Sequence, residues 1–326
     1  MIDSQCAGLD AGLVLDGVFQ GIPIVADLEA ALQLPGHKPH TLIYGMAPAD
    51  GLYSAADRRA LLAALAAGLH LVSGMREYLN DDPDFALTAA HNHVSIRDVR
   101  RPPALRDLRL FDGSITSVDC LRIAVLGTDG AIGKRTTATL LVQALNTAGI
   151  PSVLVNTGQT GLIQGGRYGI PLDAIPSQYC SGEVEAAVVE AYRREHPAVI
   201  VIEGQGSLSH PAYLSSGFIL RGARPQAVVL QHAPARQVLS DFPFLPMPSA
   251  ASEIRLIEAF APTRVIGLTL NHEGLDDHQL NAEIRRHQAE LGLPVTDAVS
   301  CSPQALVAMV QRAFPLLPIP QPCGVG

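Results

Sequence analysis

The sequence lacks a long apolar run, a basic tract and a secretory start, and each absence excludes a class of protein. No apolar stretch approaches the roughly 20 residues that a membrane-spanning helix needs. The net charge of −8 argues against a nucleic-acid-binding protein. The first residues, MIDSQCAGLD, have neither the positive charges nor the apolar core of a signal peptide. We therefore expect a cytoplasmic protein with a small-molecule substrate and no nucleic-acid or membrane partner, and we expect it to form a homo-oligomer.

Closely spaced cysteines are also missing. The five cysteines are scattered through the chain, so no pair of them forms a metal-binding or redox motif, and we predict no metal site. An odd number of thiols without a signal peptide is typical of the reducing cytoplasm. With 326 residues, of which 48% are hydrophobic and 17% charged, the chain is long enough for two domains with buried cores.

Lysine is rare, because only Lys38 and Lys134 occur among the 23 basic residues. Lys134 ends the segment GTDGAIGK (127–134), which follows the apolar run LRIAVL (121–126) and precedes a helical pattern. An apolar strand, a glycine-rich loop, a lysine and a helix form the pattern of a phosphate-binding loop. A lysine in a chain that otherwise uses arginine indicates that a flexible point charge is needed there.

Such a loop would bind phosphate with its backbone N–H groups and with the positive end of the following helix. The predicted cofactor-binding residues are Gly127, Thr128, Gly130, Gly133, Lys134, Arg135, Thr136 and Thr137. In NTPases a hydroxyl that binds Mg²⁺ usually follows the lysine directly, whereas here Arg135 intervenes. The pattern therefore favours a phosphate site over an NTPase site, and a tight turn without a ligand is the structural alternative.

The rest of the chain alternates short apolar runs with helical patterns, which predicts an α/β fold with parallel sheets. In the first half we expect strands at 41–44 and 69–73 around a helix at 58–67. In the second half we expect strands at 152–155, 198–202, 226–230 and 264–268, a helix capped by Ser181 with two glutamates in its first turn, and a last helix at 303–313. The dense charges and paired prolines near residue 102 predict domains over 1–110 and 111–326.

Polar residues follow two of the predicted strands in the second half. Because ligands bind at the carboxyl ends of parallel strands, these residues are candidates for substrate binding. They are Asn156, Thr157, Gln159, Thr160 and Gln205. Glu203 ends the apolar strand 198–202, where an acid can hold Mg²⁺ through water or accept a proton, and His210 follows in a glycine-rich segment.

Five segments of the chain resemble the family of the domain of unknown function 1611 (DUF1611), which includes D-glutamate N-acetyltransferases of the DgcN type. They are GTDGAIGKRTT (127–137), NTGQTG (156–161), EGQGSLSHPAY (203–213), DVRRPP (98–103) and SGMREYLNDDP (73–83). The resemblance implies a Rossmann-like N-terminal domain joined to a P-loop C-terminal α/β domain. Family members begin with an additional strand and helix before the segment that matches residues 2–4. Either the start of this chain is misassigned or its first domain lacks one strand.

The resemblance also implies an N-acetyltransferase of D-amino acid catabolism, with acetyl-CoA as donor and the amino group of D-glutamate as acceptor. In that reading Gly130, Gly133, Lys134 and Thr136 bind the phosphates of CoA, which requires no catalytic Mg²⁺. The acceptor ammonium must lose a proton before it attacks the thioester. The candidates for this base are Glu203, His210 and Asp129, in that order. Arg167 or Arg221 could bind the carboxylates of glutamate.

Two alternatives from other functional classes remain open. The first is an ATP- and Mg²⁺-dependent kinase or ligase, because GTD…GK also resembles dethiobiotin synthetase; Glu203 would then hold Mg²⁺ and Thr136 would reach the metal despite Arg135. The second is a non-enzymatic nucleotide switch that regulates a partner. The first predicts Mg²⁺-dependent release of phosphate from ATP, and the second predicts nucleotide binding with negligible turnover.

Overall fold

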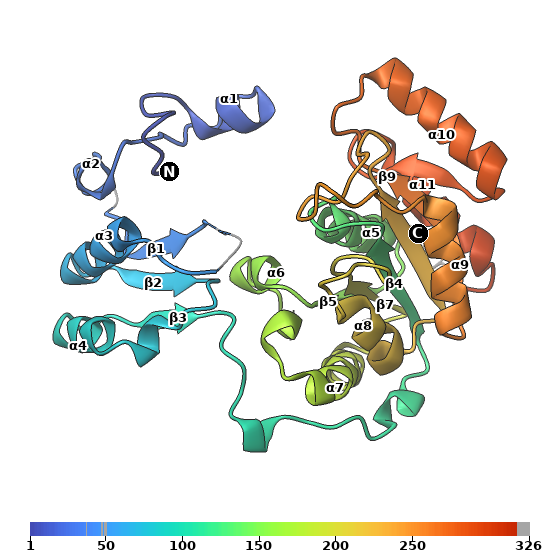
Figure 1. The fold of residues 1–326 in the computed structure, drawn as a ribbon, viewed down its shortest axis with the longest axis horizontal. Helices are drawn as coiled ribbons and strands as arrows, with labels where there is room; N and C mark the ends of the chain where they lie inside the picture. Colours follow the sequence, from blue (N-terminus) through green and yellow to red (C-terminus); the bar gives the residue numbers. More distant parts are fainter. Residues whose placement is uncertain (37, 47, 49–50, 318–326) are drawn as a thin grey trace, which may run out of the picture. The chain divides into compact units, whose positions relative to one another are not determined.

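The computed structural model describes residues 1–36, 38–46, 48 and 51–317. The chain divides into two compact units, Met1–Arg101 and Pro102–Gly326, and each is described by itself (Figure 1). Both units are built from strands that alternate with helices, and every strand pair within their two sheets is parallel. The predicted α/β class with parallel sheets is therefore confirmed.

The first unit contains a three-stranded sheet in the order β1-β2-β3. Its elements are α1 (Ala11–Asp16), α2 (Leu28–Leu32), β1 (Thr41–Tyr44), α3 (Ala55–Ala66), β2 (His70–Ser73), α4 (Pro83–His91) and β3 (Ile96–Asp98). Helix α3 begins with a capping box, because Ser54 accepts the N–H of Asp57 and the Asp57 carboxylate accepts the N–H of Ser54. Leu65, Leu71 and Phe85 are buried between the helices and the sheet.

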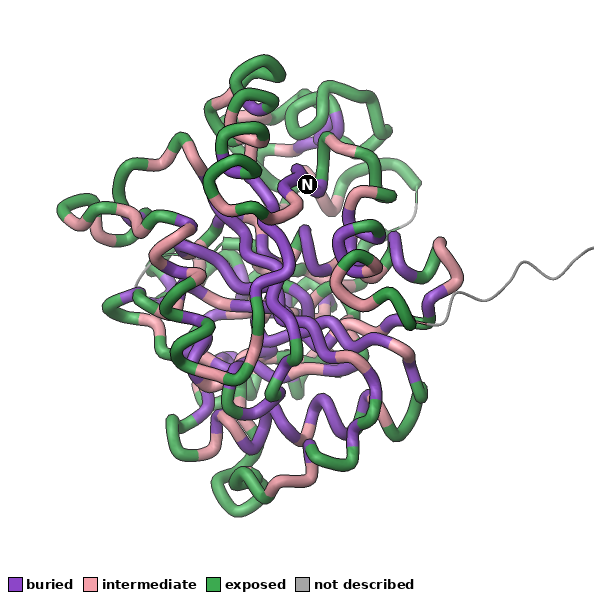
Figure 2. Tube along the Cα trace, turned by 90° about the vertical axis from the view of Figure 1, so that its right-hand side faces the viewer, coloured by how far each residue is buried: buried purple, intermediate pink, exposed green. Residues whose placement is uncertain are grey.

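The second unit contains a seven-stranded sheet in the order β10-β9-β8-β4-β7-β5-β6. Its strands are β4 (Leu121–Gly127), β5 (Ser152–Asn156), β6 (Tyr168–Gly169), β7 (Val199–Glu203), β8 (Ala227–His232), β9 (Arg264–Leu270) and β10 (Val295–Asp297). Strand β4 lies between β7 and β8, and all of its residues after Leu121 are buried. In Figure 2 the buried stretches run side by side, while exposed stretches lie mostly in the turns. The loop that follows β4 therefore starts from a central strand that both neighbours fix in place.

Helices cover both faces of this sheet, as Figure 1 shows. They are α5 (Lys134–Thr147), α6 (Gln159–Ile163), α7 (Ser177–Glu195), α8 (Ser215–Ala223), α9 (Ala250–Phe260), α10 (Asp277–Leu291) and α11 (Pro303–Ala313). One apolar core joins the sheet to α7, α8, α9 and α10, and the other joins it to α5 and α11. Two buried layers hold the sheet rigid, so the loops at the carboxyl ends of its strands have fixed starting points.

The prediction for helix α7 was wrong in its first residue. The helix begins at Ser177, directly after Pro176, so Ser181 is not its cap and the two glutamates do not lie in its first turn. Both glutamates lie inside the helix and are buried. Each accepts backbone hydrogen bonds from the segment that leads into β4. Glu183 accepts the backbone N–H of Arg109 at 2.6 Å. Glu185 accepts those of Asp112 and Ile115 at 2.9 and 3.0 Å.

Two further observations concern membrane-spanning helices and cysteines. Among the described residues, no helix combines the length and the apolar character that crossing a membrane requires. Cys6, Cys120, Cys180 and Cys301 are free thiols, and Cys323 lies outside the described residues. No disulfide therefore constrains the part of the chain that the structure describes.

Candidate functional site

The glycine-rich loop connects β4 to α5 and has an unusual backbone. Ala131 and Gly133 have positive φ angles of 48° and 97°. The left-handed region is unfavourable for alanine, and such strain is often found at functional sites. A Cβ atom on Gly127 would lie 2.9 Å from both Ile132 Cδ1 and Lys134 Cδ. Glycine at this position therefore allows the Lys134 side chain to lie directly on the loop.

The loop presents backbone N–H groups that have no partner. Among the described residues, no hydrogen bond is donated by the backbone N–H groups of residues 131–133. The first turn of α5, which begins at Lys134, adds N–H groups that helix geometry leaves without an intrahelical partner. The positive end of the helix dipole lies at the same place. This arrangement favours an anion such as phosphate.

The Lys134 ammonium is buried and points onto the loop. Its Nζ donates a hydrogen bond to the backbone carbonyl of Asp129. Burial lowers the pKa of Lys134 to about 8, while the negative charges of Asp129 and Glu203 act in the opposite direction. No ion pair with a carboxylate holds this ammonium within the described part of the chain. The charge is therefore available to a bound anion at neutral pH.

A brace on the loop, formed by Arg236 and Asp129, was not predicted from the sequence. Arg236 donates from Nη1 to Asp129 Oδ2 at 3.3 Å and to the Gly130 carbonyl at 3.1 Å, and from Nη2 to the Ala131 carbonyl at 3.1 Å. Asp129 Oδ2 also accepts the N–H of Ser240 at 3.0 Å. The fully buried Asp129 carboxylate thus fixes the loop. Arg236 follows β8 by four residues, and nothing in the sequence separates it from the other arginines.

Glu203 ends β7 beside the loop and is 6% exposed. Its Oε2 accepts the backbone N–H of Thr157 at 3.0 Å, and the Thr157 hydroxyl donates to the Glu203 carbonyl at 2.9 Å. Burial raises the pKa of Glu203, while the N–H of Thr157 and the positive charges of Arg135 and Lys134 lower it. The sheet therefore brings together the tips of β4, β5 and β7, as expected for parallel neighbours.

The other predicted substrate-binding residues line the same edge in different ways. Gln205 donates from Nε2 to the Thr157 carbonyl. Asn156 is buried and donates to the Tyr168 carbonyl at 3.2 Å, so it holds β5 against the following turn. Gln159 and Thr160 form the first turn of α6. Of this set, the structure places Thr157 and Gln205 directly beside Glu203.

Besides Lys134, three predicted cofactor residues use their side chains in contacts within the protein. The Thr128 hydroxyl lies 2.9 Å from His232 Nδ1, and the Thr137 hydroxyl donates to Gln231 Oε1 at 2.6 Å, which ties both to β8. Arg135 donates to Gln164 after α6. Thr136 instead lines a cavity of about 120 Å³ behind the loop. Thr128 and Thr137 therefore shape the loop, and their backbone N–H groups also donate within the protein, to the carbonyls of Gln231 and Gly133 at 3.1 and 2.9 Å.

The segment after β7 carries His210 and is held by α9. Glu253 on α9 accepts the backbone N–H of Leu208 at 2.5 Å and the Ser209 hydroxyl at 2.7 Å. His210 is 4% exposed, and its Nε2 lies 3.8 Å from Asp129 Oδ1. Burial lowers the pKa of His210, partly offset by the charge of Asp129. The structure thus brings His210 next to the phosphate loop, although Glu253 was not foreseen as its support.

The two arginines expected to bind a substrate carboxylate have contacts elsewhere in the second unit. Arg167 forms an ion pair with Glu195 and lies over the ring of Tyr168. Arg221 on α8 lies over the ring of Phe260, with its guanidinium carbon 4.6 Å from the ring centre. Both arginines are exposed, and they lie outside the group of side chains around the loop described above.

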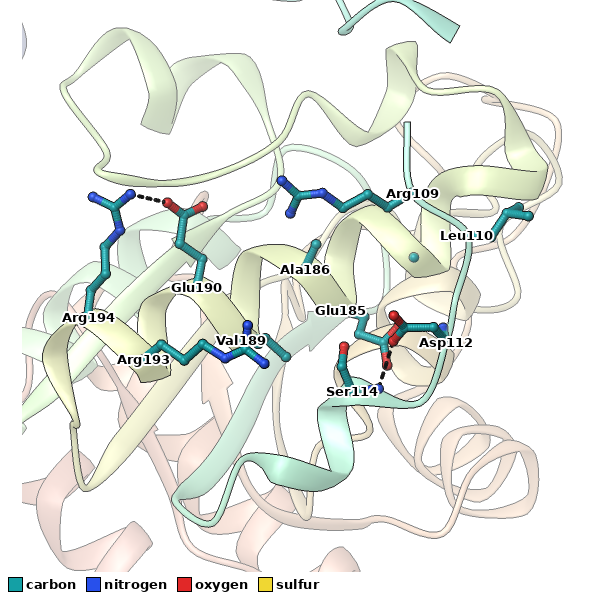
Figure 3. Close-up of a pocket in the computed structure, with 11 residues that line it drawn as sticks. Arg109, Leu110, Asp112, Ser114, Glu185, Ala186, Val189, Glu190, Arg193 and Arg194 are labelled. Atoms are coloured by element: carbon teal, nitrogen blue, oxygen red, sulfur yellow. Dashed lines mark hydrogen bonds and ion pairs between the residues drawn. The ribbon is translucent and has the colours of Figure 1, made fainter. Parts of the chain in front are cut away.

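A larger groove of about 480 Å³ lies along α7, as Figure 3 shows. Arginines and carboxylates line it, but its carboxylates already have partners. Glu185 accepts the backbone N–H groups of Asp112 and Ile115, and Glu190 forms an ion pair with Arg194 at 2.9 Å. The described residues that line this groove include no buried ammonium like that of Lys134 and no glycine-rich loop, so the phosphate loop is the candidate functional site.

Comparisons with known proteins agree with this architecture. A family model described as the P-loop domain DUF1611_C matches residues 109–307, and one described as the Rossmann-like domain DUF1611_N matches residues 4–102. A D-glutamate N-acetyltransferase from Tritonibacter scottomollicae is 31% identical over 265 residues, which cover 79% of this chain and 77% of that protein. A D-glutamate N-acetyltransferase from Pseudoalteromonas sp. is 28% identical over 275 residues, which cover 82% of this chain and 80% of that protein.

A solved structure extends the comparison to coordinates. The crystal structure of a DUF1611 family protein from Anabaena variabilis matches with a TM-score of 0.88 at 34% identity. The match covers 95% of this chain and 90% of that one. The likeness therefore includes both units.

Proposed function

Because this chain belongs to the DUF1611 family, with a Rossmann-like N-terminal domain and a P-loop C-terminal domain, we propose that it is an N-acetyltransferase. The donor would be acetyl-CoA and the acceptor the amino group of an amino acid, first of all D-glutamate. Two relatives at 28–31% identity that carry the name D-glutamate N-acetyltransferase support this proposal. The single structural observation that supports it best is a buried carboxylate beside an ammonium and a loop whose residues 131–133 donate no backbone hydrogen bond within the described part of the chain.

The phosphate loop would hold the carrier. CoA carries a pyrophosphate and a 3′-phosphate, so it offers the anionic oxygens that the loop N–H groups and Lys134 attract. We propose that Gly130, Gly133, Lys134 and Thr136 contact these phosphates. The Arg236 brace keeps the loop in its strained shape before the carrier arrives, so that little ordering is needed on binding.

Glu203 would be the general base. The acceptor arrives as an ammonium, and Glu203 takes one proton from it to give a neutral amine. The amine nitrogen then attacks the thioester carbonyl carbon, and a C–N bond forms. The C–S bond breaks, and the second proton that the nitrogen loses passes to the sulfur, so that CoA leaves as a thiol. A carboxyl group whose pKa is raised by burial suits this role, because it takes up a proton more readily at neutral pH than an exposed glutamate does.

The proposal is tested with the purified full chain in two assays. Thermal shift compares acetyl-CoA with ATP, each with and without Mg²⁺, and we expect acetyl-CoA to raise the melting temperature without Mg²⁺. Release of the CoA thiol is then followed with D-glutamate, L-glutamate and D-aspartate, and we expect turnover with D-glutamate. No turnover with any amino acid would contradict the proposal, and Mg²⁺-dependent release of phosphate from ATP would favour the kinase or ligase alternative.

A further inference from the structure

His210 is buried beside the phosphate loop, and one of its ring nitrogens lacks a hydrogen-bond partner among the described residues. Within the described residues, its Nε2 is inaccessible to solvent and has no hydrogen-bond partner. The distance of 3.8 Å to Asp129 Oδ1 is too long for a hydrogen bond. Asp129 Oδ1 already accepts the N–H of Gly130 at 2.7 Å. Buried polar groups normally find a partner, so an unpaired one at a candidate site points to a missing ligand.

The contacts of the ring decide which nitrogen carries the proton. His210 Nδ1 lies 3.2 Å from the backbone N–H of Ala212 and accepts its hydrogen bond. Rotating the ring by 180° would place a C–H group against that N–H, so the orientation is fixed. Tyr213 stacks on the ring with centroids 4.3 Å apart, and Phe242 lies against it at 5.6 Å. A neutral imidazole has one donor and one acceptor nitrogen, so the proton is on Nε2.

This tautomer cannot act as a general base from the side that faces the loop. Nε2 already carries a proton, and a base needs a lone pair directed at the reacting group. Taking up a second proton would remove the acceptor that the Ala212 N–H needs and would create a charge in a buried place. Burial accordingly lowers the pKa of His210, despite the charges of Asp129 and Asp241 nearby.

We propose that His210 donates a hydrogen bond from Nε2 to an oxygen of the acylated carrier bound in the phosphate loop. The inference rests on the proposed function, because the carrier is taken to be acetyl-CoA. An N–H donor requires an oxygen with a lone pair, and the carrier offers two kinds, a phosphate oxygen and the thioester carbonyl oxygen. The second would become an oxyanion during the reaction, and a fixed donor there stabilises the transition state.

Two substitutions separate a donor from a base. His210→Gln keeps a side-chain N–H but cannot accept the proton, and His210→Phe keeps a ring but has neither property. We expect His210→Gln to stay within about tenfold of wild-type kcat/KM, and His210→Phe to fall by roughly 10- to 100-fold, the size of one strong hydrogen bond. Thermal melts check that each variant folds.

The split between binding and turnover identifies the oxygen. A loss of CoA affinity by calorimetry would assign a phosphate oxygen, and a lower kcat with unchanged CoA affinity would assign the carbonyl oxygen; both support the donor. Two results would overturn it: a His210→Gln enzyme as inactive as His210→Phe, which indicates a base, or a His210→Phe enzyme as active as wild type.

A measurement that needs no activity keeps the inference testable if acetyl transfer is not found. In ¹⁵N-histidine-labelled protein, the signal missing from His210→Gln identifies His210. We expect the tautomer with the proton on Nε2, and slower exchange of that proton with solvent when CoA is added. A proton on Nδ1, an imidazolium at neutral pH, or no response to CoA would refute the donor role. Failure of the proposed function would instead show as absent turnover with every amino acid.

Discussion

Glu203 and Glu185 are both buried glutamates of the second unit, at 6% and 2% exposure, and both accept backbone N–H groups. Glu185 lies inside α7, and its donors come from a segment about 70 residues earlier in the chain, which it holds in place (Figure 3). Glu203 lies at the carboxyl end of a strand, beside a buried ammonium and a loop in which residues 131–133 donate no backbone hydrogen bond to any described residue. Burial and hydrogen bonds alone therefore do not single out Glu203, and its position in the sheet is what makes it the candidate for a functional carboxylate.

Replacing the Glu203 carboxylate tests this comparison with the largest expected effect. Glu203→Gln keeps an oxygen for the Thr157 N–H but cannot accept a proton. We expect kcat/KM to fall by roughly 10²- to 10⁴-fold, with a melting temperature close to wild type. Glu185→Gln is the matched control, and its folded fraction should keep wild-type kcat/KM. An active Glu203→Gln enzyme would show that another group is the base.

The two lysines of the chain provide the next test. Lys134→Met removes the ammonium from the loop but keeps a chain of similar length. We expect the affinity for CoA to fall by about 10- to 100-fold in calorimetry, the loss of one charged hydrogen-bond donor. Lys38→Met, on an exposed residue of the first unit, should bind CoA as the wild type does. Equal affinities for the two variants would remove the phosphate loop from the proposed mechanism.

Replacing Glu185 with alanine tests whether this buried carboxylate stabilises the fold. Glu185→Ala leaves the N–H groups of Asp112 and Ile115 without their acceptor. We expect the free energy of unfolding to fall by about 2–3 kcal/mol in urea titrations. Glu190→Ala, on an exposed residue of the same helix paired with Arg194, should change it by less than about 0.5 kcal/mol. Similar losses for both variants would mean that Glu185 has no special role in holding this segment.

The pH dependence of CoA binding gives the smallest effect. Burial lowers the pKa of Lys134 to about 8, and only the charged form attracts phosphate. Affinity should therefore be constant below about pH 8 and decrease as pH rises through this value. The total decrease should not exceed the factor lost in Lys134→Met, and that variant should show no such decrease. Calorimetry from pH 6.5 to 9.5 measures both. A decrease of the same size in the variant would assign it to another group.

The pH dependence of kcat/KM on the acid side runs in the opposite direction, because activity is lost as pH falls. Glu203 acts as a base only when it is ionised, and burial raises its pKa. We expect kcat/KM to decrease as pH falls through this pKa, at a higher pH than an ordinary glutamate would give. Glu203→Gln should lose this limb of the profile together with most of the activity. A limb that persists in the variant would belong to a different residue.

Much of the fold followed from local patterns. The segment 121–137 predicted a strand, a loop and a helix, and the structure has β4, the loop and α5 there. The last helix was expected over residues 303–313 and is found over Pro303–Ala313. The start of α7 was misplaced, because Ser181 and its following acids resemble a helix start. Their role as anchors depends on residues about 70 positions away.

The candidate site was only partly predictable for the same reason. Lys134 and Glu203 were predicted because Lys134 ends a glycine-rich loop and Glu203 ends an apolar run, and both are local signals. Arg236 and Glu253 were missed, because their contacts join residues 107 and 45 positions apart, and no neighbouring residue marks either of them. What these residues bind stays a prediction that the experiments above decide.

By itself, the sequence determined that a phosphate-type loop follows a buried strand, because glycine spacing and apolar periodicity are properties of neighbouring residues. It also determined that an acid ends the apolar strand 198–202, whereas the place of that strand next to β4 comes from the structure. Only the tertiary structure decided that Asp129 braces the loop with Arg236 and that the Ala212 N–H donates to His210 Nδ1. Both depend on hydrogen bonds between groups that meet only after the chain has folded, and their geometry cannot be read from the order of residues.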